Sequence, residues 1–286
     1  MTGETSRGPA SEGTAPGMPP IATAFEAARA EGRAALMPYM MGGFPDPDSS
    51  RRIADAYARS GADLVELGVP FSDPLADGPV IHAAATRALA AGATLERVLE
   101  IGERIAASVP VVPMVYANMA LARGPRRFAR LLADAGAAAV IVPDLPIDQA
   151  GEIGEELAAA QIPLVPLVAP TTPAERRRRI CAAARGFVYV VSDTRVTGER
   201  DELPPGLAEL VRAVRDAAPV PAAVGFGIGT PEQAAAVGRI ADGVIVGTRL
   251  VRAVGEADGG DAGVDAVVEF IQAARDAMRK ARNAVG

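Results

Sequence analysis

Two patterns of hydrophobic and polar positions alternate along this chain. Short runs of consecutive apolar residues recur, and between them lie longer segments in which apolar residues return every three or four positions. Because the short runs are continuously apolar, we expect them to form strands that are buried on both faces. The eight runs are Ala35–Met41, Leu64–Val69, Val111–Tyr116, Ala138–Val142, Pro163–Val168, Phe187–Val191, Pro221–Gly225 and Gly243–Val246.

The longer segments predict helices. The expected helices are Ala24–Arg33, Ser49–Arg59, Val80–Ala90, Leu95–Ala107, Pro125–Ala135, Glu175–Ala184, Gly206–Ala217, Pro231–Val237 and Val264–Ala281. Asp48 precedes the second of them as the expected N-cap, and Pro125 suits a first helical turn.

Eight strand-then-helix units predict an α/β fold, a single (β/α)8 TIM barrel with extra helices before the first strand and after the second. We expect residues 1–20, rich in Gly, Pro, Ser, Thr and Glu, to form a disordered tail, and residues 21–286 to form the catalytic barrel. A doubly wound open sheet is the alternative. It would carry a characteristically spaced glycine-rich turn after the first strand, and Met41–Phe44 lacks that spacing.

The composition of the chain limits the kinds of catalytic site that it can form. The chain has one cysteine, Cys181, one histidine, His82, and one lysine, Lys280. We therefore expect no metal site, no Ser-His-Asp triad, no Schiff-base lysine in the core, and a reducing cytoplasmic location. The net charge of −6 argues against nucleic-acid binding, and the apolar runs are too short for a membrane span. We expect no secretory signal in the first twenty residues, and the run Arg176–Arg179 to be a solvated helix face.

Two carboxylates remain as candidates for proton transfer. Glu66 interrupts the second apolar run, where burial would raise the pKa of its carboxyl group and suit it to acid/base catalysis. Its alternative role is structural, as a carboxylate bonded to backbone or arginine. Asp77 follows in a proline-rich loop, where it is either a second functional acid or a turn former or helix cap.

The stretch from Glu66 to Pro79, ELGVPFSDPLADGP, closely resembles the signature of the tryptophan synthase α subunit. Further segments resemble successive strand ends of that family. They are residues 38–46, 116–118, 143–146, 169–172, 189 with 196–198, 225–228 and 231–233. The resemblance covers nearly the whole chain except the first twenty residues.

This resemblance implies cleavage of indole-3-glycerol phosphate to indole and glyceraldehyde 3-phosphate without a cofactor. It assigns the proton transfers to Glu66, acceptance of the indole N–H to Asp77, and substrate contacts to Tyr189 and Tyr116. It also implies a partner, a β subunit that carries pyridoxal phosphate, in an α2β2 complex.

A phosphate group binds well to backbone N–H groups, and glycines leave these groups accessible. In TIM barrels such sites are frequent after the last strands. Candidate phosphate-binding residues are Gly198, Gly227, Ile228, Gly229, Gly247 and Thr248, unless these positions are ordinary tight turns. Phe44, Leu145 and Phe226 could line the indole ring or belong to the core.

The chain departs from the family at Arg195, where glycine is usual in a flexible loop, and at Arg249, Gly229 and His82. We expect His82 to be a surface helix residue, and Arg249 to face either the phosphate or solvent.

Two other functions stay open. The chain could be a standalone lyase that releases free indole, or a weakly active subunit that mainly activates its β partner.

Overall fold

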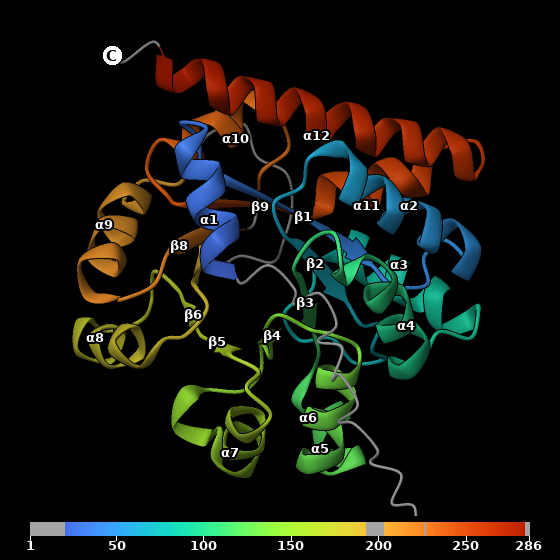
Figure 1. Ribbon diagram of the computed structural model, residues 1–286, viewed down its shortest axis with the longest axis horizontal. Coiled ribbons are helices and arrows are strands. Elements are labelled where there is room, and N and C mark those ends of the chain that lie inside the picture. The colour runs from blue at the N-terminus through green and yellow to red at the C-terminus, as the bar shows by residue number, and fades with distance from the viewer. Residues whose placement is uncertain (1–20, 193–202, 226, 284–286) are drawn as a thin grey trace, which may run out of the picture.

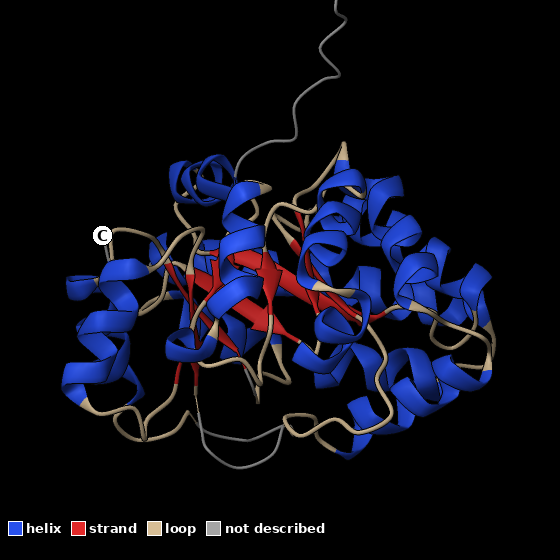
Figure 2. Ribbon diagram, turned by 90° about the horizontal axis from the view of Figure 1, so that it is seen from below, coloured by secondary structure: helices blue, strands red, loops and turns tan. Residues whose placement is uncertain are grey.

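In the computed structural model, which describes residues 21–192, 203–225 and 227–283, a ring of parallel strands is surrounded by helices (Figures 1 and 2). The strands are β1 (Ala35–Met41), β2 (Val65–Gly68), β3 (Val111–Met114), β4 (Val140–Ile141), β5 (Leu164–Val165), β6 (Leu167–Val168), β7 (Val188–Val191), β8 (Ala222–Gly225) and β9 (Gly243–Val246). Their order is β5-β4-β3-β2-β1-β9-β8-β7-β6. The predicted TIM barrel is confirmed.

The fifth apolar run accounts for the ninth strand. Pro166 divides this run into β5 and β6, because a proline has no N–H to donate to a ladder. β5 pairs with β4, and β6 pairs with β7. The ring therefore closes through the covalent chain at Pro166.

The helices are α1 (Ile21–Ala30), α2 (Pro47–Ser60), α3 (Pro79–Ala90), α4 (Leu95–Ala106), α5 (Ala117–Arg123), α6 (Pro125–Asp134), α7 (Gly151–Ala159), α8 (Ala174–Ala183), α9 (Leu207–Ala217), α10 (Pro231–Gly238), α11 (Thr248–Glu256) and α12 (Gly260–Asn283), with a 3₁₀ turn η1 (Ile147–Gln149). The extra helices α1, α3 and α4 are confirmed, and every predicted helix is present with ends shifted by a few residues. The short helices α5, α7 and α11 were not predicted. The tail expected over residues 1–20 lies outside the described residues.

One end of the barrel is closed by α1, which crosses the ring (Figure 1). Its Ile21 and Phe25 belong to the same buried cluster as the barrel interior, and the Phe25 ring lies 6.0 Å from that of Phe187. Phe187 directly precedes β7, so this closed end is where the strands begin. The carboxyl ends of the strands form the opposite end, the mouth, which is left for a site.

The second core cluster lies between the strands and the outer helices. On β1, Leu36 faces these helices, while Ala35 and Met37 face the barrel interior. Burial on both faces explains why the strand runs are continuously apolar. No described helix is long and apolar enough to cross a membrane.

The start of α2 corrects one prediction. The N-cap is Asp46 rather than Asp48, because Pro47 already has helical geometry as the first residue of the helix. The Asp46 carboxylate accepts hydrogen bonds from the N–H groups of Asp48 and Ser49, at 3.0 and 2.9 Å.

We expect Asp46→Ala to lower the free energy of unfolding by about 1 kcal/mol, because two N–H groups of α2 lose their acceptor. Asp48→Ala is the matched control. It removes only an exposed ion pair with Arg51, so a change of about 0.5 kcal/mol or less is expected. Urea unfolding of both variants measures the difference, and equal losses would contradict the assignment of Asp46 as the cap.

Candidate active site at the barrel mouth

A small pocket at the mouth brings together most of the predicted chemistry. Its lining residues are Tyr39, Glu66, Asp77, Ile81, Met114, Tyr189, Gly227, Ile245, Gly247 and Thr248. Its volume is about 40 Å³, close to that of one water molecule. Six of these residues were predicted. Tyr39, Ile81, Met114 and Ile245 were not.

The carboxyl group of Glu66 is buried in this pocket. The residue is 1% exposed on β2, and its Oε2 atom has no hydrogen-bond partner among the described residues. Burial, and to a lesser extent the nearby charge of Asp77, raise the pKa of this carboxyl from 4.5 to about 8. Glu66 is therefore mostly protonated at neutral pH and able to donate a proton.

Asp77 is held beside it by Tyr116, which follows β3. The Ala76 N–H donates to the Tyr116 hydroxyl oxygen at 3.1 Å, and this hydroxyl is also hydrogen-bonded to Asp77. The Phe71 ring, at the start of the same loop, stacks on Tyr116 at 5.2 Å between centroids. Tyr116 thus anchors the loop that carries Asp77.

Burial raises the pKa of Asp77, while the Tyr116 hydrogen bond and the charge of His82 lower it. His82 itself is exposed on α3, as predicted. Asp77 is only half-buried, unlike Glu66, and so the two carboxyl groups have different surroundings within one pocket. Such a pair suits a proton donor and a hydrogen-bond acceptor with separate roles.

Two buried tyrosines complete the walls, each packed against a glycine on a neighbouring strand. Tyr39 on β1 lies against Gly68 on β2, and Tyr189 on β7 lies against Gly225 on β8. A Cβ atom at either glycine would overlap the tyrosine hydroxyl. The glycines therefore let both rings lie close to the sheet at the level of Glu66, which is in register with Tyr39.

The other side of the pocket offers backbone donors. Gly247 and Thr248 begin α11, which has no side-chain cap, so its first N–H groups remain available for an anion. By contrast, α10 is capped by Thr230 and Gln233, and the Gln233 side chain also accepts from the Gly229 N–H at 2.7 Å. An anion is therefore better placed at α11 than at α10.

Several predicted residues lie elsewhere. Phe44 is buried under Arg87, whose guanidinium carbon lies 5.5 Å from the ring centroid, and Ile228 belongs to the outer core cluster. Leu145 lines a separate cavity between α7 and α8. Arg249 lies over the Phe270 ring at 5.9 Å. Gly198, Phe226 and Arg195 are outside the described residues.

No group of three or more His, Cys, Asp or Glu residues with the spacing of a metal site occurs within the described chain. The pocket instead combines a protonated buried acid, a second carboxyl group, apolar walls and uncapped backbone N–H groups. This arrangement can transfer a proton to an apolar ligand whose other end carries an anionic group.

Comparison with known proteins agrees with this geometry. The family model described as tryptophan synthase alpha chain matches residues 25–280. The chain is 48% identical to the tryptophan synthase alpha chain of Halorhodospira halophila, over 82% of this chain and 88% of that protein. It is also 48% identical to that of Prochlorococcus marinus, over 81% and 86% of the two chains.

Solved structures show the same likeness. A structure of Mycobacterium tuberculosis tryptophan synthase matches with a TM-score of 0.84 and 36% identity, over 91% of this chain and 98% of that one. Tryptophan synthase subunit alpha from Legionella pneumophila matches with a TM-score of 0.82 and 34% identity, over 91% and 98%. The chain therefore belongs to the tryptophan synthase alpha chain family.

Proposed function

We propose that this chain cleaves indole-3-glycerol phosphate into indole and glyceraldehyde 3-phosphate, with Glu66 as the acid/base and Asp77 as the acceptor of the indole N–H. The observation that carries this proposal is the buried Glu66 carboxyl, with a pKa of about 8, in one pocket with Asp77 and Tyr189. The reaction is that of a carbon–carbon lyase in tryptophan biosynthesis.

The proton transfers balance on Glu66 alone. Its carboxylic acid gives a proton to indole C3, which makes the ring a leaving group. The resulting carboxylate takes the proton of the glycerol hydroxyl as the carbon–carbon bond breaks and the aldehyde forms. Asp77 accepts a hydrogen bond from the ring N–H and so stabilises the positive charge that develops on the protonated ring.

Substrate binding follows from the pocket walls. The apolar side chains of Ile81, Met114 and Ile245, with the rings of Tyr39 and Tyr189, suit the flat indole ring. The phosphate fits the uncapped start of α11 at Gly247 and Thr248, and Gly227 lines the same pocket. Gly198 and Phe226 stay as predicted contacts.

The partner proposed for this chain is a tryptophan synthase β subunit, which would receive the indole, in the cytoplasmic setting that the single cysteine favours. Among the described residues, the exposed large hydrophobic side chains are Leu75, 83% exposed, Leu121, 59% exposed, and Leu89, 37% exposed. Leu75 lies in the Asp77 loop, and Leu121 lies on α5, directly after Tyr116. Both belong to the mouth, so this apolar surface suits a protein partner.

Glu66→Gln should lower the rate of indole formation by at least about 100-fold. The other buried hydroxyls among the described pocket residues, those of Tyr39 and Tyr189, have pKa values that burial raises further, so they are much weaker proton donors. The dissociation constant for indole-3-glycerol phosphate should change only a few-fold. Asp77→Ala should also lower turnover strongly, whereas Asp73→Ala, at an exposed acid of the same loop, is the control. Equal losses of binding and turnover in Glu66→Gln would contradict the acid/base role, and an unchanged rate in Asp77→Ala would make Asp77 a turn former.

The pH dependence of stability tests the state of Glu66. A raised carboxyl pKa means that the folded protein binds a proton more tightly than the unfolded chain between pH 4.5 and about 8. The contribution of Glu66 to the free energy of unfolding is fully present below pH 4.5. It is lost as the pH rises toward 8, at up to about 1.4 kcal/mol per pH unit. Glu66→Gln should therefore gain stability relative to the unsubstituted chain across this window. Urea unfolding of both proteins at a series of pH values measures this difference in stability. If the difference between the two proteins does not change with pH, the raised pKa of Glu66 is contradicted.

Leu75→Ser should weaken association with a β subunit about tenfold, the loss expected when one buried leucine side chain is removed. Leu89→Ser is the control, because Leu89 lies at the far end of α3 from the mouth. A second experiment measures indole formation by the unsubstituted chain with and without the β subunit. Slow turnover accelerated by the β subunit supports the proposal. Fast turnover of the chain alone indicates a standalone lyase, and no turnover in either case indicates a binding subunit.

A further inference from the structure

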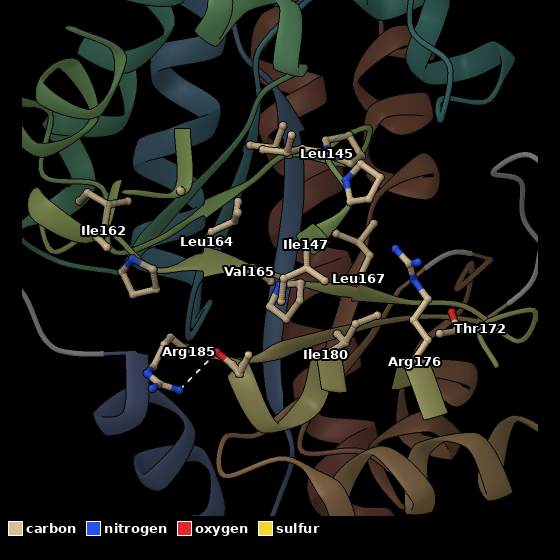
Figure 3. Close-up of a pocket in the computed structure, with 18 of the residues that line it drawn as sticks. Leu145, Ile147, Ile162, Leu164, Val165, Leu167, Thr172, Arg176, Ile180 and Arg185 are labelled. Atoms are coloured by element: carbon tan, nitrogen blue, oxygen red, sulfur yellow. Dashed lines mark hydrogen bonds between the residues drawn. The ribbon is translucent and has the colours of Figure 1, made fainter. Parts of the chain in front are cut away.

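A cavity of about 640 Å³ opens between α7 and α8, away from the Glu66 pocket (Figure 3). Its floor is the barrel wall at Leu164, Val165 and Leu167, and its sides include Leu145, Ile147 and Ile180. We call this cavity the α7–α8 seam. Its volume lies within the range typical of small-molecule sites, roughly 300–1,000 Å³.

The seam exists because the barrel is least regular here. β4, β5 and β6 have two residues each, and Pro166 interrupts the ladder. α7 packs against α6 and α8 against α9, but within the described chain α7 and α8 make no comparable contact with each other. The positions that face the seam from these helices include the small residues Gly154, Ala158 and Ala183, which cannot fill it.

The seam leaves apolar surface open to water. Leu164 and Leu167 are only half-buried, although most strand residues of the barrel are fully buried. Leu145 and Ile147 are half-buried beside them. Covering such aliphatic surface is favourable, by about 25 cal/mol for each Å² removed from water, and so the floor favours an apolar ligand.

The two arginines that line the seam differ in whether a carboxylate pairs with them. Figure 3 shows Arg176 and Arg185 at opposite ends of the row of aliphatic side chains. Arg176 pairs with Asp148 at 2.8 Å, and Arg179 pairs with the same carboxylate. Arg185 donates to the carbonyl oxygens of Ala183 and Ala184, at 3.3 and 2.9 Å, and forms no ion pair with any described residue. Its guanidinium is therefore positioned by two carbonyl groups while it stays exposed to solvent, where it can meet an anion.

We propose that the α7–α8 seam binds a small carboxylate with an aliphatic body. The hydrocarbon chain lies over Leu164 and Leu167, and the carboxylate meets the guanidinium of Arg185, which can hold it with two parallel hydrogen bonds. This site is separate from the lyase pocket and does not depend on the function proposed for Glu66.

Octanoate is a suitable probe, with octan-1-ol as the uncharged ligand of equal chain length. We expect octanoate to bind the full chain with a dissociation constant below about 1 mM. It should bind about two- to fivefold tighter than octan-1-ol, which is the gain expected from one ion pair at a surface. Isothermal titration calorimetry measures both, and amide chemical shifts should change in α7, α8 and β4–β6.

Two pairs of variants locate the site. Ala158→Phe fills the seam from an exposed helix position and should weaken both ligands about tenfold, whereas Ala159→Phe, on the same helix but outside the lining, should not. Arg185→Gln should weaken octanoate binding about two- to fivefold and leave octan-1-ol binding unchanged. Arg178→Gln, at an exposed arginine of α8 outside the seam, is its control.

The proposal is overturned if octanoate and octan-1-ol bind equally, if Ala158→Phe leaves octanoate binding unchanged, or if octanoate does not bind at about 10 mM. It is also overturned if octanoate fails to bind while Ala158→Phe alters the sedimentation of the chain, because the seam would then be a contact between proteins. Indole formation by these variants reports separately on the lyase pocket.

Discussion

The site depends on one carboxyl group kept out of water. Glu66 stands in a strand that is buried on both faces, and its Oε2 atom has no protein partner within the described chain. Ionising such a group is unfavourable, so the barrel keeps it protonated at a pH where an exposed glutamate would have lost its proton. The fold thereby provides a proton donor inside the pocket at neutral pH.

The walls around this carboxyl are arranged for the same purpose. Tyr39 and Tyr189 reach it only because Gly68 and Gly225 leave room for their rings on the neighbouring strands. Tyr116 fixes the loop that carries Asp77, through its own hydroxyl group and through the stacked Phe71 ring. Closure of the opposite end by α1 leaves the mouth as the open side of the barrel at which these groups meet.

The sequence predicted the barrel because the strand runs are continuously apolar and each is followed by a helical pattern. It also predicted Glu66, since a carboxylate inside such a run is unusual. It did not single out Tyr39, Met114 or Ile245. In a strand buried on both faces, the inward and outward residues are equally apolar, so only three-dimensional register separates them.

The expected N-cap at Asp48 was wrong because the pattern alone did not show that Pro47 already belongs to the helix. For Phe44 and Leu145 the sequence left two alternatives, a contact with the indole ring or a place in the core. Phe44 belongs to the outer core cluster, and Leu145 packs against that cluster and lines a separate cavity. The individual roles of Glu66 and Asp77 rest on the family resemblance together with the geometry, and they stay predictions.

The proline within the fifth strand divides the barrel wall into sectors of unequal strength. Around Pro166 the ladder consists of two-residue strands, whereas β1 pairs along its length with β2 and β9. Local opening costs least where backbone pairing is shortest. The wall can therefore open locally at β4–β6 while the strands that carry Tyr39 and Glu66 stay in register. The segment of the barrel that fluctuates most easily is thus separate from the strands that position the site residues.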